Sequence, residues 1–139
     1  HNVIHDACYT KADCGSVRTF GRNNLSQTAV HDLTFHENIF VNAIGNMEGC
    51  KTGVGVRAFG FYIDNYSRDV TLTGNTVISA TVHGILFQNS TGSVTGNTLY
   101  NNGRAWDYAA QVYVGGSPAY VGTHTGNVLY GPRPTVRTI

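Results

Sequence analysis

One short stretch of the chain combines an aromatic ring with a carboxylate in a pattern that suits sugar binding. The segment GFYIDN, residues 60–65, alternates between apolar and polar side chains, as expected for a β-strand with one buried face. The alternation predicts that Phe61 and Ile63 face the core, whereas Tyr62 and Asp64 face solvent. A tyrosine ring can cover the face of a sugar while a carboxylate accepts bonds from its hydroxyl groups. We therefore expect a saccharide-binding surface on this strand.

A second strand of the same kind follows at GILFQN, residues 84–89. Its alternation divides four side chains between the two faces: Ile85 and Phe87 in the core, Leu86 and Gln88 outside. If the two strands are neighbours, Tyr62 stacks on Leu86. His83 directly precedes this strand and is expected near the same face.

Two arginines, Arg18 and Arg57, precede or begin strands for which the sequence allows two alignments. One alignment places GSVRT, starting at Gly15, beside GFYID, starting at Gly60. The other places VRTFG beside VRAFG and stacks the two arginines on each other. Stacked like charges are unfavourable unless they are exposed or share an anion such as an acidic sugar. Both alignments remain open at this point.

The elements that position these residues are predicted by a repeated phrase. TGNTV at residues 73–77 returns as TGNTL at 95–99 and as TGNVL at 125–129. Alignment on the asparagine before an apolar pair gives five equivalent positions: Asn2, Asn38, Asn75, Asn97 and Asn127. Units of 22 to 37 residues with about three short strands each are typical of the coils of a parallel β-helix.

The recurring asparagine has a structural role in such a fold. Stacked coils place equivalent residues about 4.8 Å apart, so one amide can bond the next and also the turn backbone. The glycine ahead of it, at Gly74, Gly96 and Gly126, permits a positive φ. The sequence therefore predicts one all-β domain over residues 1–139, a β-helix of about four to five coils with a buried asparagine ladder.

The composition agrees with a strand-rich fold and narrows the classes of partner. Charged residues make up 12% of the 139 residues, and lysine and glutamate are nearly absent, which disfavours long helices. A net charge of +1 is not typical of a protein that binds nucleic acid or an anionic membrane. We expect neither partner.

The loops between strands differ in length, and recognition usually lies on the longer ones. The longer excursions are residues 8–22, 45–59 and 103–108, the last of which holds Trp106. The cysteines Cys8, Cys14 and Cys50 do not have the spacing of a zinc site, and we expect no metal. A structural disulfide between Cys8 and Cys50, in equivalent loops of neighbouring repeats, is the favoured pairing.

Both ends of the sequence resemble interrupted coils. His1 begins inside a repeat, and PRPTVRTI at the other end does not resemble a capping coil. Because terminal coils need capping, we expect this chain to be part of a longer β-helix or to pack against a second chain.

Two segments resemble right-handed parallel β-helix proteins that act on polysaccharides, the pectin-lyase-like glycoside hydrolases and polysaccharide lyases. IHDACYTKADCGSVRTFG is similar to their I-H-D…D-x-G-A-I-Y-T-x-G stretch, and GFYIDNYSRDVTLTGNTV to their G-x-Y-L-D-D…N-V-x-V-x-x-N-x-V stretch. The resemblance covers about 100 of the 139 residues. It implies a right-handed β-helix, an exported protein in the periplasm or outside the cell, and a polysaccharide substrate. We expect no cofactor.

In hydrolases of this type two aspartates supply acid and base or nucleophile. The resemblance carries these roles to Asp13 and Asp64. Arg18 stands where the family has an aromatic residue, and Asn65 stands where it has a second acid. Glycosidic cleavage needs carboxyl groups roughly 5 to 9.5 Å apart. The strand positions separate Asp13 from Asp64 by up to about 20 Å unless the loop before residue 14 bends back.

Elimination from a uronic acid is the competing chemistry. It needs a cation that neutralises the sugar carboxylate and a base that removes the C5 proton. Residues of the right types are Arg18, Arg57, Lys11, Tyr62 and His83. The sequence predicts hydrolysis first and elimination second, and a non-catalytic structural or surface β-helix is the alternative from a different class.

Overall fold

The computed structural model describes residues 1–22, 24, 26, 29–46, 48, 55–105, 109–117, 120–133 and 135–139. Within these residues the secondary structure consists of strands and turns, and fourteen strands form three sheets. Every paired strand is parallel to its neighbour.

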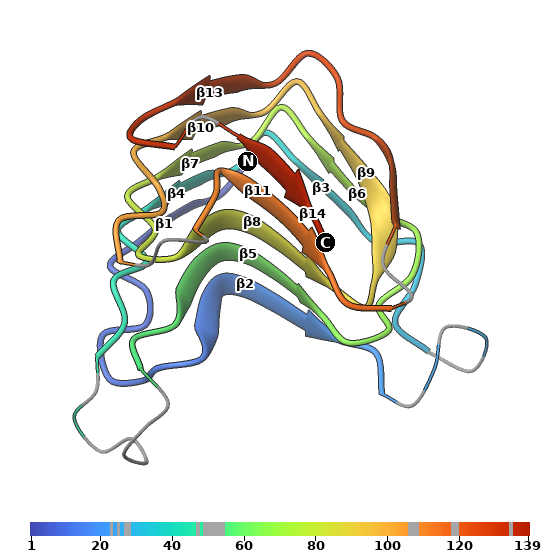
Figure 1. Cartoon of the computed structure of the whole chain (residues 1–139), viewed down its shortest axis with the longest axis horizontal. Coiled ribbons are helices and arrows are strands. Elements are labelled where there is room, and N and C mark those ends of the chain that lie inside the picture. The colour runs from blue at the N-terminus through green and yellow to red at the C-terminus, as the bar shows by residue number, and fades with distance from the viewer. Residues whose placement is uncertain are drawn as a thin grey trace.

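The chain visits the three sheets in turn and then returns to the first one (Figure 1). The first sheet contains β1 (Val3–His5), β4 (Ile39–Val41), β7 (Thr76–Ile78), β10 (Thr98–Tyr100) and β13 (Val128–Tyr130). The second sheet contains β2 (Cys14–Phe20), β5 (Ala58–Asp64), β8 (His83–Gln88), β11 (Val112–Gly115) and β14 (Val136–Thr138). The third sheet contains β3 (Thr34–His36), β6 (Val70–Thr73), β9 (Thr91–Thr95) and β12 (Tyr120–Thr123).

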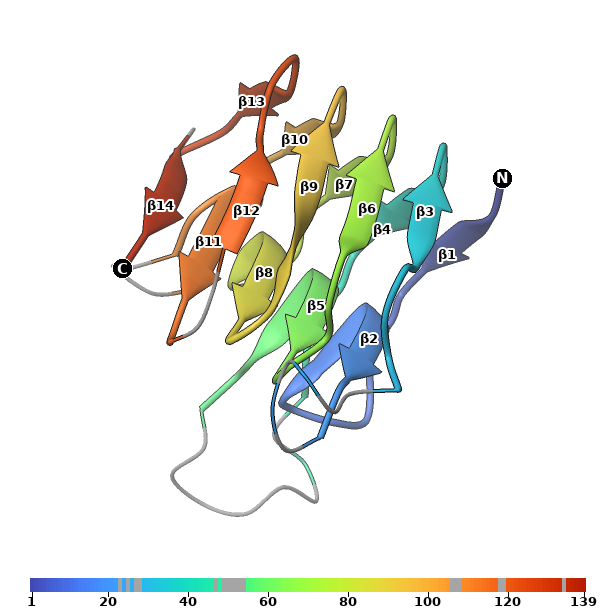
Figure 2. The same ribbon diagram turned by 90° about the vertical axis from the view of Figure 1, so that its right-hand side faces the viewer.

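Figure 2 shows the strands of each sheet arranged side by side in the order of the repeats. This all-parallel arrangement is compatible with the predicted β-helix. The predicted alignment of the repeats is confirmed, because Val3 pairs with Ile39, Ile39 with Thr76, and Thr76 with Thr98 and onward to Val128.

The asparagine ladder is also confirmed, at the turn that leads into the first sheet. The backbone N–H and side-chain amide of Asn38 both donate to Asn75 Oδ1 at 3.0 Å. Asn75 repeats this pattern on Asn97, and Asn97 on Asn127. The preceding glycines have the expected positive φ, 64° at Gly74 and 63° at Gly96. These asparagines are scaffold.

Aromatic and aliphatic side chains from all three sheets fill the interior. Phe61 lies at its centre, in edge-to-face contact with Phe35 and Phe40 at ring-centroid distances of 5.7 and 4.6 Å. The four predicted core residues of β5 and β8 are fully buried: Phe61, Ile63, Ile85 and Phe87. The alternation in the sequence therefore predicted the inner face of both strands correctly.

The glycines of β5 and β8 allow these strands to approach the interior more closely than other residues permit. A Cβ atom on Gly60 would lie 2.2 Å from the side chain of Val77, and one on Gly84 would lie 2.7 Å from Leu99. Because Gly60 and Phe61 both face inward, the alternation of inward and outward positions along β5 is interrupted between them. Phe59 and Tyr62, on either side of this point, meet outside with ring centroids 4.6 Å apart.

The register of β2 differs from both alignments that the sequence allowed. Val17 pairs with Phe61, Arg18 with Tyr62, and Thr19 with Ile63. This register keeps Val17 and Thr19 on the inner face, where Thr19 is hydrogen-bonded to Ser67 at 2.8 Å. It places Arg18 outside on the Tyr62 ring, so the predicted alternative with stacked arginines is wrong.

Candidate functional site

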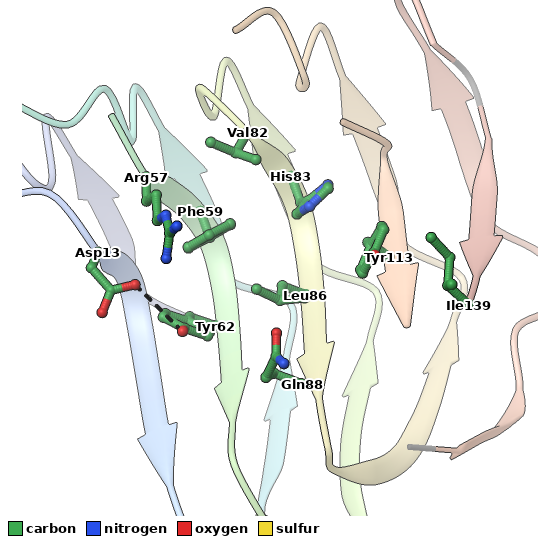
Figure 3. Close-up of a pocket in the computed structure, with 10 residues that line it drawn as sticks. All are labelled: Asp13, Arg57, Phe59, Tyr62, Val82, His83, Leu86, Gln88, Tyr113 and Ile139. Atoms are coloured by element: carbon green, nitrogen blue, oxygen red, sulfur yellow. Dashed lines mark hydrogen bonds between the residues drawn. The ribbon is translucent and has the colours of Figure 1, made fainter. Parts of the chain in front are cut away.

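A pocket of about 410 Å³ lies on the outer face of the second sheet (Figure 3). It is lined by Asp13, Arg57, Phe59, Tyr62, Val82, His83, Leu86, Gln88, Tyr113 and Ile139. Four of the six candidate residues from the sequence are in this lining. Arg18 is hydrogen-bonded to Asp13 of the lining, and Asp64 is hydrogen-bonded to Arg18. The second sheet thus brings the candidates from several repeats into one place.

Arg18 connects the charged groups beside the pocket. Its guanidinium donates to the Asp64 carboxylate at 2.5 Å and to the backbone carbonyl of Asp13 at 3.1 Å. It also forms an ion pair with the Asp13 carboxylate at 3.8 Å and lies 4.7 Å from the centre of the Tyr62 ring. Burial lowers the pKa of Arg18, but the hydrogen bond and charge of Asp64 outweigh this effect and raise it. The guanidinium is a permanent cation.

Asp64 is not on the solvent face, which corrects the prediction from alternation. Its side chain is 1% exposed, because Arg18 covers one oxygen and the Asn65 amide donates to the other at 2.7 Å. Alternation assigns a residue to the outer face of a strand but does not reveal what covers that face. Asp64 is thereby fixed as the partner of Arg18.

Tyr62 is also covered rather than exposed, with 8% of its surface accessible. The phenol donates to Asp13 Oδ1 at 3.4 Å, the contact drawn as a dashed line in Figure 3. Burial, followed by the negative charges of Asp64 and Asp13, raises the pKa of the phenol above its usual value. The prediction that Tyr62 stacks on Leu86 is confirmed by the register of β5 and β8.

Asp13 reaches the pocket from the loop that precedes β2. Its backbone has a φ of 57°, and the next residue, Cys14, forms a disulfide with Cys8 across a Cα–Cα distance of 5.9 Å. The predicted pairing of Cys8 with Cys50 is therefore wrong, and Cys50 lies outside the described residues. A bend within a short closed loop is local geometry that the repeat spacing does not reveal.

This bend brings Asp13 and Asp64 together. Because both carboxylates contact one guanidinium group, their contacting oxygens lie within about 9 Å of each other. The loop before residue 14 bends back, which is the condition that the sequence set for bringing the two aspartates closer than the roughly 20 Å of an extended strand.

His83 lies at the base of the pocket between two aromatic rings. It stacks on Phe59 at 5.7 Å and on Tyr113 at 4.5 Å, and only 2% of its surface is exposed. Its Nδ1 accepts a hydrogen bond from the Ala110 N–H at 3.0 Å. Burial lowers the pKa of His83 to about 4, so the imidazole is neutral at pH 7 with its proton on Nε2. The prediction that it lies near the face of Tyr62 is confirmed.

The sequence reasoning missed Tyr113 and Phe59, the two rings that enclose His83. VYVG at residues 112–115 has the same alternation as the neighbouring strands and places Tyr113 beside Leu86. Alignment of this alternation with that of β8 would have indicated the outward position of Tyr113. The alternation did not indicate that Phe59 faces outward, because Phe59 precedes the glycine at which the alternation is interrupted.

The remaining polar candidates lie elsewhere. Two His-Asp dipeptides outside the pocket lining form local contacts, His5 to Asp6 at 2.9 Å and His31 to Asp32 at 2.6 Å. Lys11 is exposed in the disulfide loop and does not line the pocket. The insertion at 103–108 lies partly outside the described residues, and Trp106 is among those not described.

Comparison of the chain with protein-family models, curated proteins and solved structures found no match. The functional argument therefore depends on the geometry of the pocket.

Proposed function

We propose that the pocket binds a segment of an acidic polysaccharide and cleaves it by β-elimination. The observation that carries this proposal is the hydrogen-bonded pair of Tyr62 and Asp13 in the same pocket as Arg57. The pair combines a proton donor with a carboxylate, and the arginine supplies a cation for the carboxylate of a uronic acid.

The pocket lining combines aromatic rings with polar groups, a combination that suits sugars. Phe59, Tyr62 and Tyr113 offer ring surfaces, and Gln88 offers both a donor and an acceptor to hydroxyl groups. In the proposed complex Arg57 neutralises the sugar carboxylate, which makes the adjacent C5 proton more acidic.

Two residues of the pocket lining, Asp13 and Tyr62, carry out all the proposed proton transfers. Asp13 accepts the C5 proton, the electron pair of the C5–H bond forms the C4–C5 double bond, and the C4–O bond breaks. The Tyr62 phenol protonates the departing oxygen, and the resulting phenolate recovers a proton from Asp13 through their hydrogen bond. The raised pKa of Tyr62 keeps the phenol protonated until that step, and the nearby Arg18 stabilises the transient phenolate.

His83 has a positioning role in this scheme. Its Nδ1 already accepts the Ala110 N–H, and its pKa of about 4 makes it a weak base at pH 7. The imidazole holds the Phe59 and Tyr113 rings parallel to itself and so shapes the pocket floor.

Hydrolysis by Asp13 and Asp64 is the second candidate, favoured by the separation of the two carboxylates, which is within about 9 Å. The burial of Asp64 and its pairing with Arg18 count against it, because a carboxylate at 1% exposure does not reach a substrate without rearrangement.

The two chemistries give different products. We expect soluble uronate polymers to yield unsaturated, ultraviolet-absorbing products, and Tyr62→Phe to lower kcat by roughly a hundredfold with little change in KM. Reducing ends without absorbance, released from a neutral glycan and lost in Asp64→Asn, would favour hydrolysis. If wild-type protein cuts and binds none of these polymers, a non-catalytic surface or structural role replaces both.

The wider setting belongs to the same proposal. We place the pocket on a right-handed parallel β-helix of four to five coils that is exported to the periplasm or cell exterior. The Cys8–Cys14 disulfide supports an oxidising compartment. The proposed partner besides the polysaccharide is a further part of a longer chain, or a second chain, that covers an open coil end.

A further inference from the structure

One row of side chains crosses all five strands of the second sheet on its outer face. The strand registers place neighbouring members beside one another in the order Arg18, Tyr62, Leu86, Tyr113 and Arg137. Paired residues of parallel strands point to the same side of a sheet. The row therefore begins and ends with an arginine and has aromatic and aliphatic side chains between them.

Arg137 ends this row on the side of the pocket opposite Arg18. It is exposed on β14, and Ile139, two residues further along the same strand direction, lines the pocket. The backbone N–H of Ile139 donates to the Val114 carbonyl at 3.0 Å, which fixes the end of β14 beside β11. The positive charge of Arg137 also contributes to lowering the pKa of His83, which agrees with its position on the pocket side.

The two ends of the row differ in their electrostatics. Arg18 is engaged by the carboxylates of Asp13 and Asp64. Arg137 is paired with Tyr113 in the strand register at the opposite end, four strand spacings or about 19 Å from Arg18. An anionic ligand therefore meets an exposed cation on this side of the pocket.

We propose that Arg137 is a second cationic subsite, which binds the acidic group of a sugar unit beyond the one held at Arg57. This inference rests on the proposed function and sharpens it. The preferred substrate is a chain with repeated acidic units that lies across the strands and covers Tyr62, Leu86 and Tyr113. The apolar and aromatic middle of the row suits the faces of sugar rings, and the arginine selects a charged unit at the far end.

The test uses purified uronic-acid oligomers of increasing length, from the disaccharide to chains that span the row, with the full chain as the protein. Arg137→Gln is expected to weaken binding of the long oligomers about tenfold and to leave the disaccharide unchanged. Arg137→Lys keeps the charge and should restore most of the affinity. Arg104→Gln is the matched control, because Arg104 is also exposed but bonds to Asn101 outside the pocket.

Three outcomes would overturn this assignment while the proposed function stands: no change in Arg137→Gln, an equal loss for short and long oligomers, or an equal loss in Arg104→Gln. Failure of the wild-type protein to bind any acidic oligomer would overturn the proposed function itself. Sulfated neutral oligomers of the same lengths show whether the subsite takes carboxylate or any sugar-borne anion, and esterified uronates, which lack the charge, should lose the advantage of length.

Discussion

The asparagine turn and the pocket face are both built by stacking equivalent positions of successive repeats. The residue at these positions is constant at the turn and varies on the pocket face. At the turn, Asn38, Asn75 and Asn97 make the same two hydrogen bonds to the next repeat. On the pocket face the residue type changes from each strand to the next, in the order Arg18, Tyr62, Leu86, Tyr113 and Arg137.

The difference separates the requirements of folding from those of ligand recognition. A repeated amide satisfies buried turn backbone in every coil, so the same residue is needed each time. A ligand that lies over several coils instead meets a group that changes from one coil to the next. The four predictions below test this separation, and they begin with the largest expected effect.

The first prediction concerns the centre of the ladder. Asn75→Ala removes the acceptor of two Asn38 donors and leaves the carbonyls of Phe35 and Thr73 without the amide that bonds them. We expect the free energy of unfolding to fall by about 4 kcal/mol, since each buried unsatisfied group costs about 1 to 3 kcal/mol. Urea unfolding measures this loss.

Asn2→Ala is the matched control at the exposed end of the same ladder. The side-chain amide of Asn2 donates to Asn38, and water can replace that contact. A loss below about 1 kcal/mol is expected there. Equal losses at both positions would contradict the view that burial makes the ladder a scaffold.

The second prediction concerns His83, the buried imidazole of the pocket. Its folded pKa of about 4 lies below the unfolded value of 6.5, so between these pH values the unfolded chain binds one more proton. The contribution of His83 to the free energy of unfolding is therefore fully present above pH 6.5. It decreases by about 3 kcal/mol as the pH falls toward 4.

Denaturant unfolding of the wild type and of His83→Gln at several pH values isolates this contribution. The glutamine carbonyl can still accept the Ala110 N–H, whereas it does not titrate. The difference between the two proteins should shrink as the pH approaches 4. A difference that is constant with pH would show that His83 titrates normally and that the pocket floor is wet.

The sequence predicted the repetitive part of the molecule better than the pocket, for a physical reason. Asparagine spacing gave the register of the first sheet, and alternation gave Phe61 and Ile63 as core, because both signals repeat with the backbone. The cover over Asp64, and the bend that carries Asp13, come from a single loop with no counterpart in other repeats. Only three-dimensional packing determines contacts of that kind.

The third prediction decides whether Asp64 belongs with the scaffold or with the chemistry. Asp64→Asn leaves Arg18 without its closest carboxylate, and we expect a loss of about 2 kcal/mol in unfolding free energy, less than for a fully buried pair because Arg18 is 39% exposed. Binding of acidic oligomers should weaken as well, since Arg18 also holds Asp13.

Asp69→Asn provides the comparison, because Asp69 pairs with Arg68 at the surface and should cost less than about 1 kcal/mol. A double-mutant cycle of Asp64→Asn with Arg18→Gln measures the coupling between the two side chains. Unchanged stability in Asp64→Asn together with complete loss of cleavage would show that Asp64 is a catalytic group and not part of the scaffold.

The smallest expected change in stability belongs to the Cys8–Cys14 disulfide, which holds the loop that carries Asp13. The paired substitutions Cys8→Ser and Cys14→Ser should lower the free energy of unfolding by less than about 2 kcal/mol, because the closed loop is short.

The effect of these substitutions on the activity of the pocket should be larger than their effect on stability suggests. Without the disulfide the contacts to Arg18 and Tyr62 hold Asp13 less firmly, so kcat on acidic polymers should fall while the ladder remains intact. Reduction of the wild-type protein should reproduce that loss, and reoxidation should restore it, with unfolding curves recorded in parallel. If activity and stability instead decline together in the same proportion, the loop belongs to the scaffold, and the proposed division between repeated and unrepeated positions does not hold at this point.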